Sequence, residues 1–302
     1  MPMPSTCPTA LLLLALAAPA TAQPAPSVPE PLWETTGLST PESVVLDPAR
    51  NQFYVSNMAS WGEGATPGDG FISRLDAQGR ILELKWVTGL QNPKGLALAN
   101  GRLYAGDDDA LVEIDLDSGA IVRRHMPEDG GPGAFNDATA DPQGNVYVFS
   151  RRLDTVYRLD GGLGGGRFAP WARIDTRITG KPNGLRAEAD RLVMGSWQVP
   201  GPEGEQLGHL STVAFADRAI GRIGTRPIGH IDGIEPDGRG GYTVTDWTHG
   251  KLLHVGADGQ VRELLSLAKG SADHHYAKDE RLLVIPLLFD GTVRAYRWAP
   301  AD

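Results

Sequence analysis

A turn followed by a short apolar strand recurs six times along this chain. The clearest two copies are residues 36–42 and residues 88–94, which both read Thr-Gly-Leu, then two residues, a proline and a charged residue. Four further copies share this frame, with a polar residue at the same place: residues 135–137, 182–184, 231–233 and 272–274. Successive copies lie roughly 41 to 52 residues apart. Internal repeats of this length are typical of propeller blades.

The segment after each turn has the pattern of β-hairpins. A second short strand follows in every copy, such as residues 145–148, and then a third strand that alternates, such as residues 155–159. Alternation with period two, interrupted by Gly, Asp and Asn, is typical of hairpins, and no stretch has sustained helical periodicity. The sequence therefore predicts an all-β, six-bladed β-propeller, with blades that start near residues 38, 90, 133, 180, 229 and 270. A β-sandwich would not repeat the same loop residue six times.

The two ends of the repeat array predict how the ring closes. The sixth copy ends at Trp298 after three strands, whereas residues 31–37 precede the first copy and resemble residues 84–88, the outer strand of blade one. We therefore expect residues 31–37 to complete the last blade. Such closure leaves no unpaired sheet edge in that blade.

The N-terminal segment has the pattern of a secretory signal peptide. An apolar run over residues 10–18 ends in Ala20-Thr21-Ala22, and the run is too short to span a bilayer. We expect residues 1–22 to be removed, residues 23–302 to form the propeller, and the protein to be periplasmic or secreted. The only cysteine, Cys7, lies within the predicted signal peptide, so the mature chain would have no disulfide.

Charge and composition limit the partners of the chain. The formal net charge is −9 and no basic stripe is present, which argues against nucleic acid and anionic membranes as partners. No later segment is apolar enough to span a membrane. We expect a monomer that takes a small-molecule substrate.

The polar residue of each repeat is expected to face the central channel, because the strand that follows it is innermost. These six residues are Glu42, Lys94, Asn136, Asn183, Asp232 and Asp273. Five of them offer oxygen, the donor that hard cations such as calcium prefer, whereas zinc prefers nitrogen and sulfur. Calcium is therefore favoured, with magnesium, manganese or zinc as alternatives. Another reading is that Asn-Gly and Asp-Gly are simply common turn residues.

Four of these motifs resemble the senescence-marker-protein/gluconolactonase family, which includes regucalcin. They are Pro41-Glu42-Ser43, Phe135-Asn136-Asp137 followed by Asp141-Pro142-Gln143-Gly144, Pro182-Asn183-Gly184 and Asp232-Gly233. The resemblance extends from Trp33 to Trp298. It implies a six-bladed propeller that hydrolyses sugar lactones or other cyclic esters. It further implies that Glu42, Asn183 and Asp232 ligate a divalent metal and that Asn136 orients the substrate, with approach to the metal as a second role.

The chain departs from the family pattern at two positions that bear on chemistry. The family has an arginine that contacts a sugar acid two residues before the Asn136 position, where this chain has Ala134. Lys94 lies at an axial position where a cation is not expected, so that it either repels a metal or forms a salt bridge with Asp273 or Glu42. Sugar lactones are therefore a doubtful substrate class.

Several other residues are candidates for substrate contact. His274 adjoins Asp273 and is a candidate proton shuttle or extra ligand, although most isolated histidines have no such role. Trp197 and Trp247 follow second strands and either line the mouth of the channel or pack in the core. Lys94, Asp273, His274 and Asn136 form the predicted substrate-binding set.

Two functions of different classes fit these residues. The first is a metal-dependent hydrolase of a lactone or small ester, in which Asp232 or a neighbouring carboxylate activates water and Asn136 holds the substrate oxygen. The second is a non-catalytic propeller of the NHL type that binds a small ligand or a peptide, since a fold does not by itself fix a function. No Gly-x-Ser-x-Gly motif is present, which argues against the common type of serine hydrolase.

Overall fold

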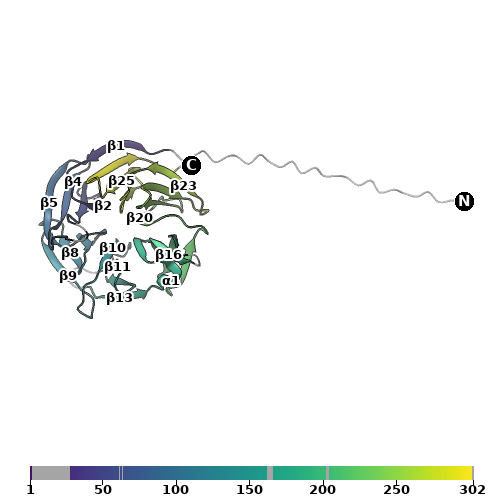
Figure 1. Ribbon diagram of the computed structural model, residues 1–302, viewed down its shortest axis with the longest axis horizontal. Helices are drawn as coiled ribbons and strands as arrows, with labels where there is room; N and C mark the ends of the chain where they lie inside the picture. The colour runs from purple at the N-terminus through teal and green to yellow at the C-terminus, as the bar shows by residue number, and fades with distance from the viewer. Residues whose placement is uncertain (2–27, 61, 63, 162–165, 202–203, 301–302) are drawn as a thin grey trace.

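A computed structural model describes Met1 and residues 28–60, 62, 64–161, 166–201 and 204–300. Apart from Met1, the predicted signal peptide lies outside the described residues. The described chain forms six four-stranded antiparallel sheets arranged as a ring around a central axis (Figure 1). The prediction of an all-β, six-bladed propeller is therefore confirmed.

Within each blade, neighbouring strands pair antiparallel from the centre of the ring outward. The first three blades contain β2 (Pro41–Asp47), β3 (Gln52–Asn57), β4 (Gly70–Asp76) and β5 (Ile81–Leu90); β6 (Leu96–Ala99), β7 (Arg102–Gly106), β8 (Leu111–Asp115) and β9 (Ile121–His125); and β10 (Phe135–Ala140), β11 (Val146–Ser150), β12 (Thr155–Leu159) and β13 (Phe168–Arg173).

The last three blades follow the same plan. They contain β14 (Pro182–Ala187), β15 (Arg191–Ser196), β18 (Leu210–Ala214) and β19 (Ile220–Ile223); β20 (Ile231–Pro236), β21 (Tyr242–Asp246), β22 (Lys251–Val255) and β23 (Val261–Ser266); and β24 (His275–Ala277), β25 (Leu282–Leu287), β26 (Thr292–Arg297) and β1 (Glu30–Thr35). Blade four also carries a short hairpin, β16 (Gln198–Gly201) with β17 (Gly204–Leu207), and one helical turn, α1 (Thr176–Thr179), precedes it.

The tight turns explain why the hairpins form where the sequence predicts them. Between β6 and β7 the chain reverses over two residues, Asn100 and Gly101, and both have positive φ, 51° and 72°. Asn-Gly is the preferred pair for this turn because its twist matches that of the flanking strands.

The ring closes through the N-terminal strand. β1 pairs antiparallel with β26, and Figure 1 shows the purple β1 beside the yellow C-terminal strands. The Trp33 side chain packs edge-on against Phe53 of blade one, with ring centroids 5.8 Å apart, and the Thr35 hydroxyl donates to the Gly79 carbonyl at 2.5 Å. The closure predicted from the match between residues 31–37 and 84–88 is confirmed.

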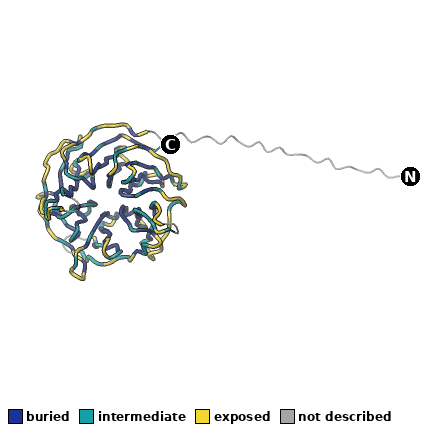
Figure 2. Tube along the Cα trace, viewed as in Figure 1, coloured by how far each residue is buried: buried dark blue, intermediate teal, exposed yellow. Residues whose placement is uncertain are grey.

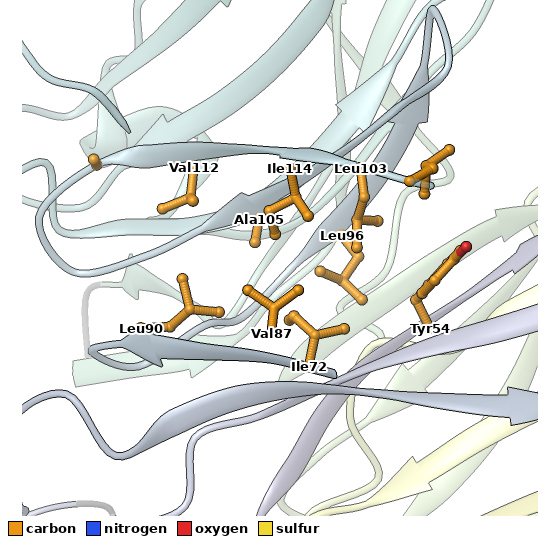
Figure 3. Close-up of a cluster of buried hydrophobic side chains, with 11 residues drawn as sticks. Tyr54, Ile72, Val87, Leu90, Leu96, Leu103, Ala105, Val112 and Ile114 are labelled. Atoms are coloured by element: carbon orange, nitrogen blue, oxygen red, sulfur yellow. The ribbon is translucent and has the colours of Figure 1, made fainter. Parts of the chain in front are cut away.

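The apolar core lies between neighbouring blades. Among the described residues, six clusters of buried apolar side chains each join one blade to the next. Figure 3 shows one of them, in which Ile72, Val87 and Leu90 of blade one meet Leu103 and Val112 of blade two. Exposed residues gather toward the outer edge of the ring, and the inner strands are mostly buried (Figure 2). This packing fixes the inner strands and therefore the polar side chains that they carry.

Candidate functional site

Four of the predicted axial residues occupy the same place in their blades. Glu42, Asn136, Asn183 and Asp232 are each the second residue of an innermost strand, in β2, β10, β14 and β20. In all four strands the pairing register shifts directly at this residue. A bulge of this kind bends the strand and redirects a side chain. The repeated position in the sequence thus corresponds to a β-bulge at the same place in each of these four blades.

These side chains meet in one cavity of about 320 Å³. Its lining residues are Glu42, Met58, Lys94, Asn136, Arg151, Asn183, Trp197, Asp232, Trp247 and Leu288. Five predicted site residues are therefore brought together from five different blades. The volume suits a small molecule.

Hydrogen bonds link Asn136, Asn183 and Asp232 at the base of this cavity. Together with Glu42, these residues form what we call the acidic floor. The Asn136 side-chain amide donates to the Asn183 amide oxygen, and Asn183 Nδ2 donates to Asp232 Oδ1 at 2.8 Å. Glu42 is 7% exposed, and its Oε2 atom is buried without a hydrogen-bond partner. A buried oxygen without a partner is costly unless a cation or a donor meets it.

Two buried carboxyl groups of this cavity, Glu42 and Asp232, have raised pKa values. Burial raises the pKa of Glu42 well above its ordinary value, and the nearby carboxylates of Asp232 and Asp273 raise it further. Burial also raises the pKa of Asp232, again with a contribution from Asp273. Lys94 and Arg151 oppose the shift at Glu42, and Arg151 opposes it at Asp232. Carboxylates that are buried this close together repel one another unless a proton or a positive ion relieves them.

The residues present fit a hard divalent cation. Glu42 and Asp232 offer carboxylate oxygens, Asn183 offers an amide oxygen, and no histidine or cysteine lines the described cavity. Such a donor set suits calcium or magnesium and does not suit a structural zinc site. Three oxygen ligands would leave coordination positions for water and substrate.

Lys94 lines the cavity but makes different contacts from those predicted. Its ammonium group donates to Asp108 Oδ1 at 2.7 Å and to the Asn92 carbonyl at 3.1 Å. Of the two alternatives for Lys94, the salt bridge with Asp273 or Glu42 is therefore wrong. The reason is local: β6 begins at Leu96, so Lys94 lies in the preceding turn, within reach of the loop after β7.

The structure places Asp273 and His274 away from this cavity. Both line a second cavity of about 230 Å³, which is formed by residues further along the innermost strands. Backbone hydrogen bonds tie Asp273 to blade one: its amide donates to the Glu42 carbonyl at 2.9 Å. As a result its carboxylate accepts from the Ser43 hydroxyl at 2.6 Å.

The His274 side chain belongs to the core of the inner strands. It is 1% exposed, and its Nε2 atom lies 2.7 Å from the Thr243 hydroxyl. Burial lowers the pKa of His274 to about 4. The ring is therefore neutral at physiological pH and is not in the cavity that Asn136 and Asp232 line.

A second ring of lining residues was not predicted as a set. In five blades the residue directly after the second strand lines the cavity: Met58, Arg151, Trp197, Trp247 and Leu288. The alternative in which Trp197 and Trp247 line the channel is confirmed. The shared position after the second strand was a signal in the sequence that could have identified Arg151.

Arg151 lies beside Ala134 in the structure. Its backbone amide donates to the Ala134 carbonyl at 3.0 Å across the β10–β11 hairpin. A guanidinium group is thus supplied to the cavity from the neighbouring strand, although Ala134 itself carries no charge.

No protein-family model and no curated protein matches this sequence. The structure, in contrast, resembles solved propellers. A gluconolactonase from Xanthomonas campestris superposes with a TM-score of 0.66 at 16% identity, covering 94% of this chain and 99% of that one. Regucalcin from Agrobacterium tumefaciens, a calcium-binding protein, gives 0.64 at 16% identity, covering 92% and 96%.

A streptogramin B lyase gives a TM-score of 0.59 at 13% identity, covering 88% of this chain and 97% of the lyase. Within the described residues, no helix is both long and apolar enough to cross a bilayer. At these identities the likeness bears on fold. The chain is accordingly a six-bladed propeller whose fold is similar to that of a gluconolactonase and of regucalcin.

Proposed function

We propose that this protein is a metal-dependent hydrolase that opens a lactone or another small ester in the cavity lined by Glu42 and Asp232. The observation that supports this most is the buried Oε2 atom of Glu42, which has no partner and lies in an acidic floor below an open cavity. The likeness to a gluconolactonase adds support from the fold.

Glu42, Asn183 and Asp232 would hold the ion, and calcium is our first choice because all three offer hard oxygen ligands. When bound, a divalent ion polarises the carbonyl of the substrate and stabilises negative charge on its oxygen. The fold likeness to a calcium-binding regucalcin is consistent with this choice.

Asp232 is the proposed general base. Its carboxyl lines the cavity, and burial together with the charge of Asp273 raises its pKa above the ordinary value. It would accept a proton from the attacking water as the water oxygen bonds to the carbonyl carbon. The proton would then pass to the ring oxygen as the carbon–oxygen bond of the ester breaks.

The other lining residues would position the substrate. The Asn136 amide donates hydrogen bonds within the floor and could donate to a substrate oxygen instead. Met58, Trp197, Trp247 and Leu288 provide apolar walls, and Ala134 replaces the family arginine. We therefore expect less polar lactones to be better substrates than gluconolactone.

The rival function is a propeller that binds a small ligand without chemistry. Two cations, Lys94 and Arg151, line the same cavity and would oppose a bound metal ion. Under this alternative the cavity holds an anionic ligand and no hydrolysis occurs.

The test is a panel of lactones and aryl esters, assayed with protein that has been treated with a chelator and reloaded with calcium, magnesium, manganese or zinc. We expect turnover with at least one substrate. Asp232→Ala should lower turnover by at least about 100-fold, since it removes both a ligand and the base. Asn136→Ala should lower turnover but leave metal affinity, measured by calorimetry, unchanged.

Asp190→Asn, a substitution of an exposed aspartate away from the cavity, is the control. Activity that persists in chelator and in Asp232→Ala would disprove the mechanism. Metal binding without any turnover across the panel would favour the binding function.

We further propose that the protein works outside the cytoplasm after cleavage following Ala22. N-terminal sequencing of the protein recovered from its native host tests this directly. Retention of Met1 in the recovered protein would contradict the proposal.

A further inference from the structure

Two histidines and an aspartate meet in blade five, outside the acidic floor. His230 precedes β20, Asp246 ends β21, and His249 lies in the turn before β22. One candidate ligand atom of each residue lies within 4.8 Å of those of the other two. His249 Nδ1 is 2.8 Å from Asp246 Oδ2, and His230 Nδ1 is 4.0 Å from Asp246 Oδ1.

The Asp246 carboxylate is held in place by the backbone. Its side chain is 4% exposed, and Oδ1 accepts from the backbone amides of His230 and His249, both at 3.2 Å. Gly229 lies against the other oxygen, where a Cβ atom would come within 2.4 Å of Oδ2. The chain therefore packs closely around this carboxylate and presents both imidazoles to it. Such preorganisation of ligands lowers the cost of binding an ion.

The two histidines differ in exposure and in hydrogen bonding, and both differences fit a metal site. His230 Nδ1 is buried and has no hydrogen-bond partner, although a carboxylate oxygen lies 4.0 Å away. That distance is too long for a hydrogen bond. Two ligands of one ion with bonds of about 2 Å lie roughly 3 to 3.5 Å apart, so a small side-chain rotation would bring both into range. The side chain of His249 is 47% exposed, which gives an ion access from solvent.

We propose that His230, Asp246 and His249 bind a divalent transition metal, zinc in the first place, at a site distinct from the oxygen-lined floor. Two imidazole nitrogens and one carboxylate are the ligands of many zinc sites, and they leave a fourth position open. The floor offers oxygen ligands only, so the two sites would select different ions.

The position of the site connects it to the mouth of the cavity. The His230 ring lies 5.2 Å from Trp197, measured between centroids, and Trp197 lies 5.3 Å from Trp247. Both tryptophans line the central cavity. An ion bound to His230 would therefore fix one wall of the mouth, and the nearby indoles provide an optical readout of its binding.

The same blade contains a matched control. His254 Nε2 lies 2.8 Å from Asp237 Oδ2, so this pair has the same short contact as His249 and Asp246. No second histidine joins it in a comparable cluster within the described residues. A histidine–aspartate pair that serves only the fold would behave like this one.

The experiment measures zinc binding to the chelator-treated protein by competition with a chromophoric chelator, in the presence of excess calcium. We expect one zinc ion per chain, with affinity reduced at least tenfold in both His249→Ala and His230→Ala and unchanged in His254→Ala. Nickel should quench tryptophan fluorescence in the wild type, and the quenching should fall in Trp197→Phe. Circular dichroism establishes that each variant is folded.

Three results would overturn the proposal. They are the absence of stoichiometric zinc binding, equal loss of affinity in His254→Ala, and loss of affinity in Asp232→Asn while His249→Ala still binds. The last result would place the zinc in the acidic floor. Because His249 is half-exposed and lies in a turn, its replacement by alanine is not expected to prevent folding.

Discussion

Asp273→Asn should lose less stability than the wild type as the pH rises from 5 to 8. Burial raises the pKa of the Asp273 carboxyl to about 7, and the charge of Glu235 contributes to the rise. The side chain lies between blades six and one, where it accepts a hydrogen bond from the Ser43 hydroxyl at 2.6 Å. Asparagine has nearly the same shape, can still accept that bond and carries no charge at any pH.

The size of the effect follows from the two pKa values. An unfolded aspartate has a pKa of about 3.9, so between about pH 4 and pH 7 the unfolded chain loses a proton that the folded protein retains. Stability therefore falls as pH rises through this window and is constant above it. Between pH 5 and pH 8 this group alone should cost the wild type about 3 kcal/mol relative to the variant.

Urea unfolding of both proteins at pH 5 and pH 8, in chelator, measures this difference. We expect the unfolding free energy of Asp273→Asn, relative to that of the wild type, to be about 3 kcal/mol higher at pH 8 than at pH 5. The exposed Asp190→Asn should show no such shift. A gap that is the same at both pH values, or that moves in favour of the wild type, would refute the reasoning.

Two further predictions concern closure and the cavity cation. Removal of the chain through Gly37 deletes β1 and the packing of Trp33 on Phe53. This truncation should lower the free energy of unfolding by about 3 kcal/mol or more and the melting temperature by at least about 6 °C. An unchanged melting temperature would contradict the role of β1 in closure. Lys94→Met should tighten calcium binding several-fold, as measured by calorimetry, because it removes a positive charge near Glu42. The melting temperature of this variant should change little, because the partner Asp108 is half-exposed and such ion pairs contribute less than about 1 kcal/mol to stability. A calcium affinity equal to that of the wild type would mean that the Lys94 charge does not act on the site.

The repeat made the ring predictable from the sequence. Each blade is a local unit of hairpins with its own turn residues, so alternation and turns identify the strands without reference to distant contacts. The match between residues 31–37 and 84–88 even predicted which strand completes the last blade, since equivalent strands have equivalent neighbours. Glu42, Asn136, Asn183 and Asp232 were found for the same reason, because each follows the same turn.

The contacts of the other two predicted axial residues, Lys94 and Asp273, depend on tertiary structure. Lys94 and Asp273 occupy the repeated frame in sequence, but their innermost strands, β6 and β24, begin only two residues later. Without the bulge of the other four blades, Lys94 turns to Asp108 and Asp273 turns to Ser43. A side chain's direction depends on the local register with the neighbouring strand and blade, and the repeated frame does not contain that information.

Sequence therefore determined the fold and the polar frame of the channel, because both arise from short-range patterns repeated six times. Tertiary structure alone decided which side chains share a cavity, placed Arg151 beside Ala134, and brought His230, Asp246 and His249 together. These contacts join different strands and turns, where the spacing along the chain does not predict the distance between side chains.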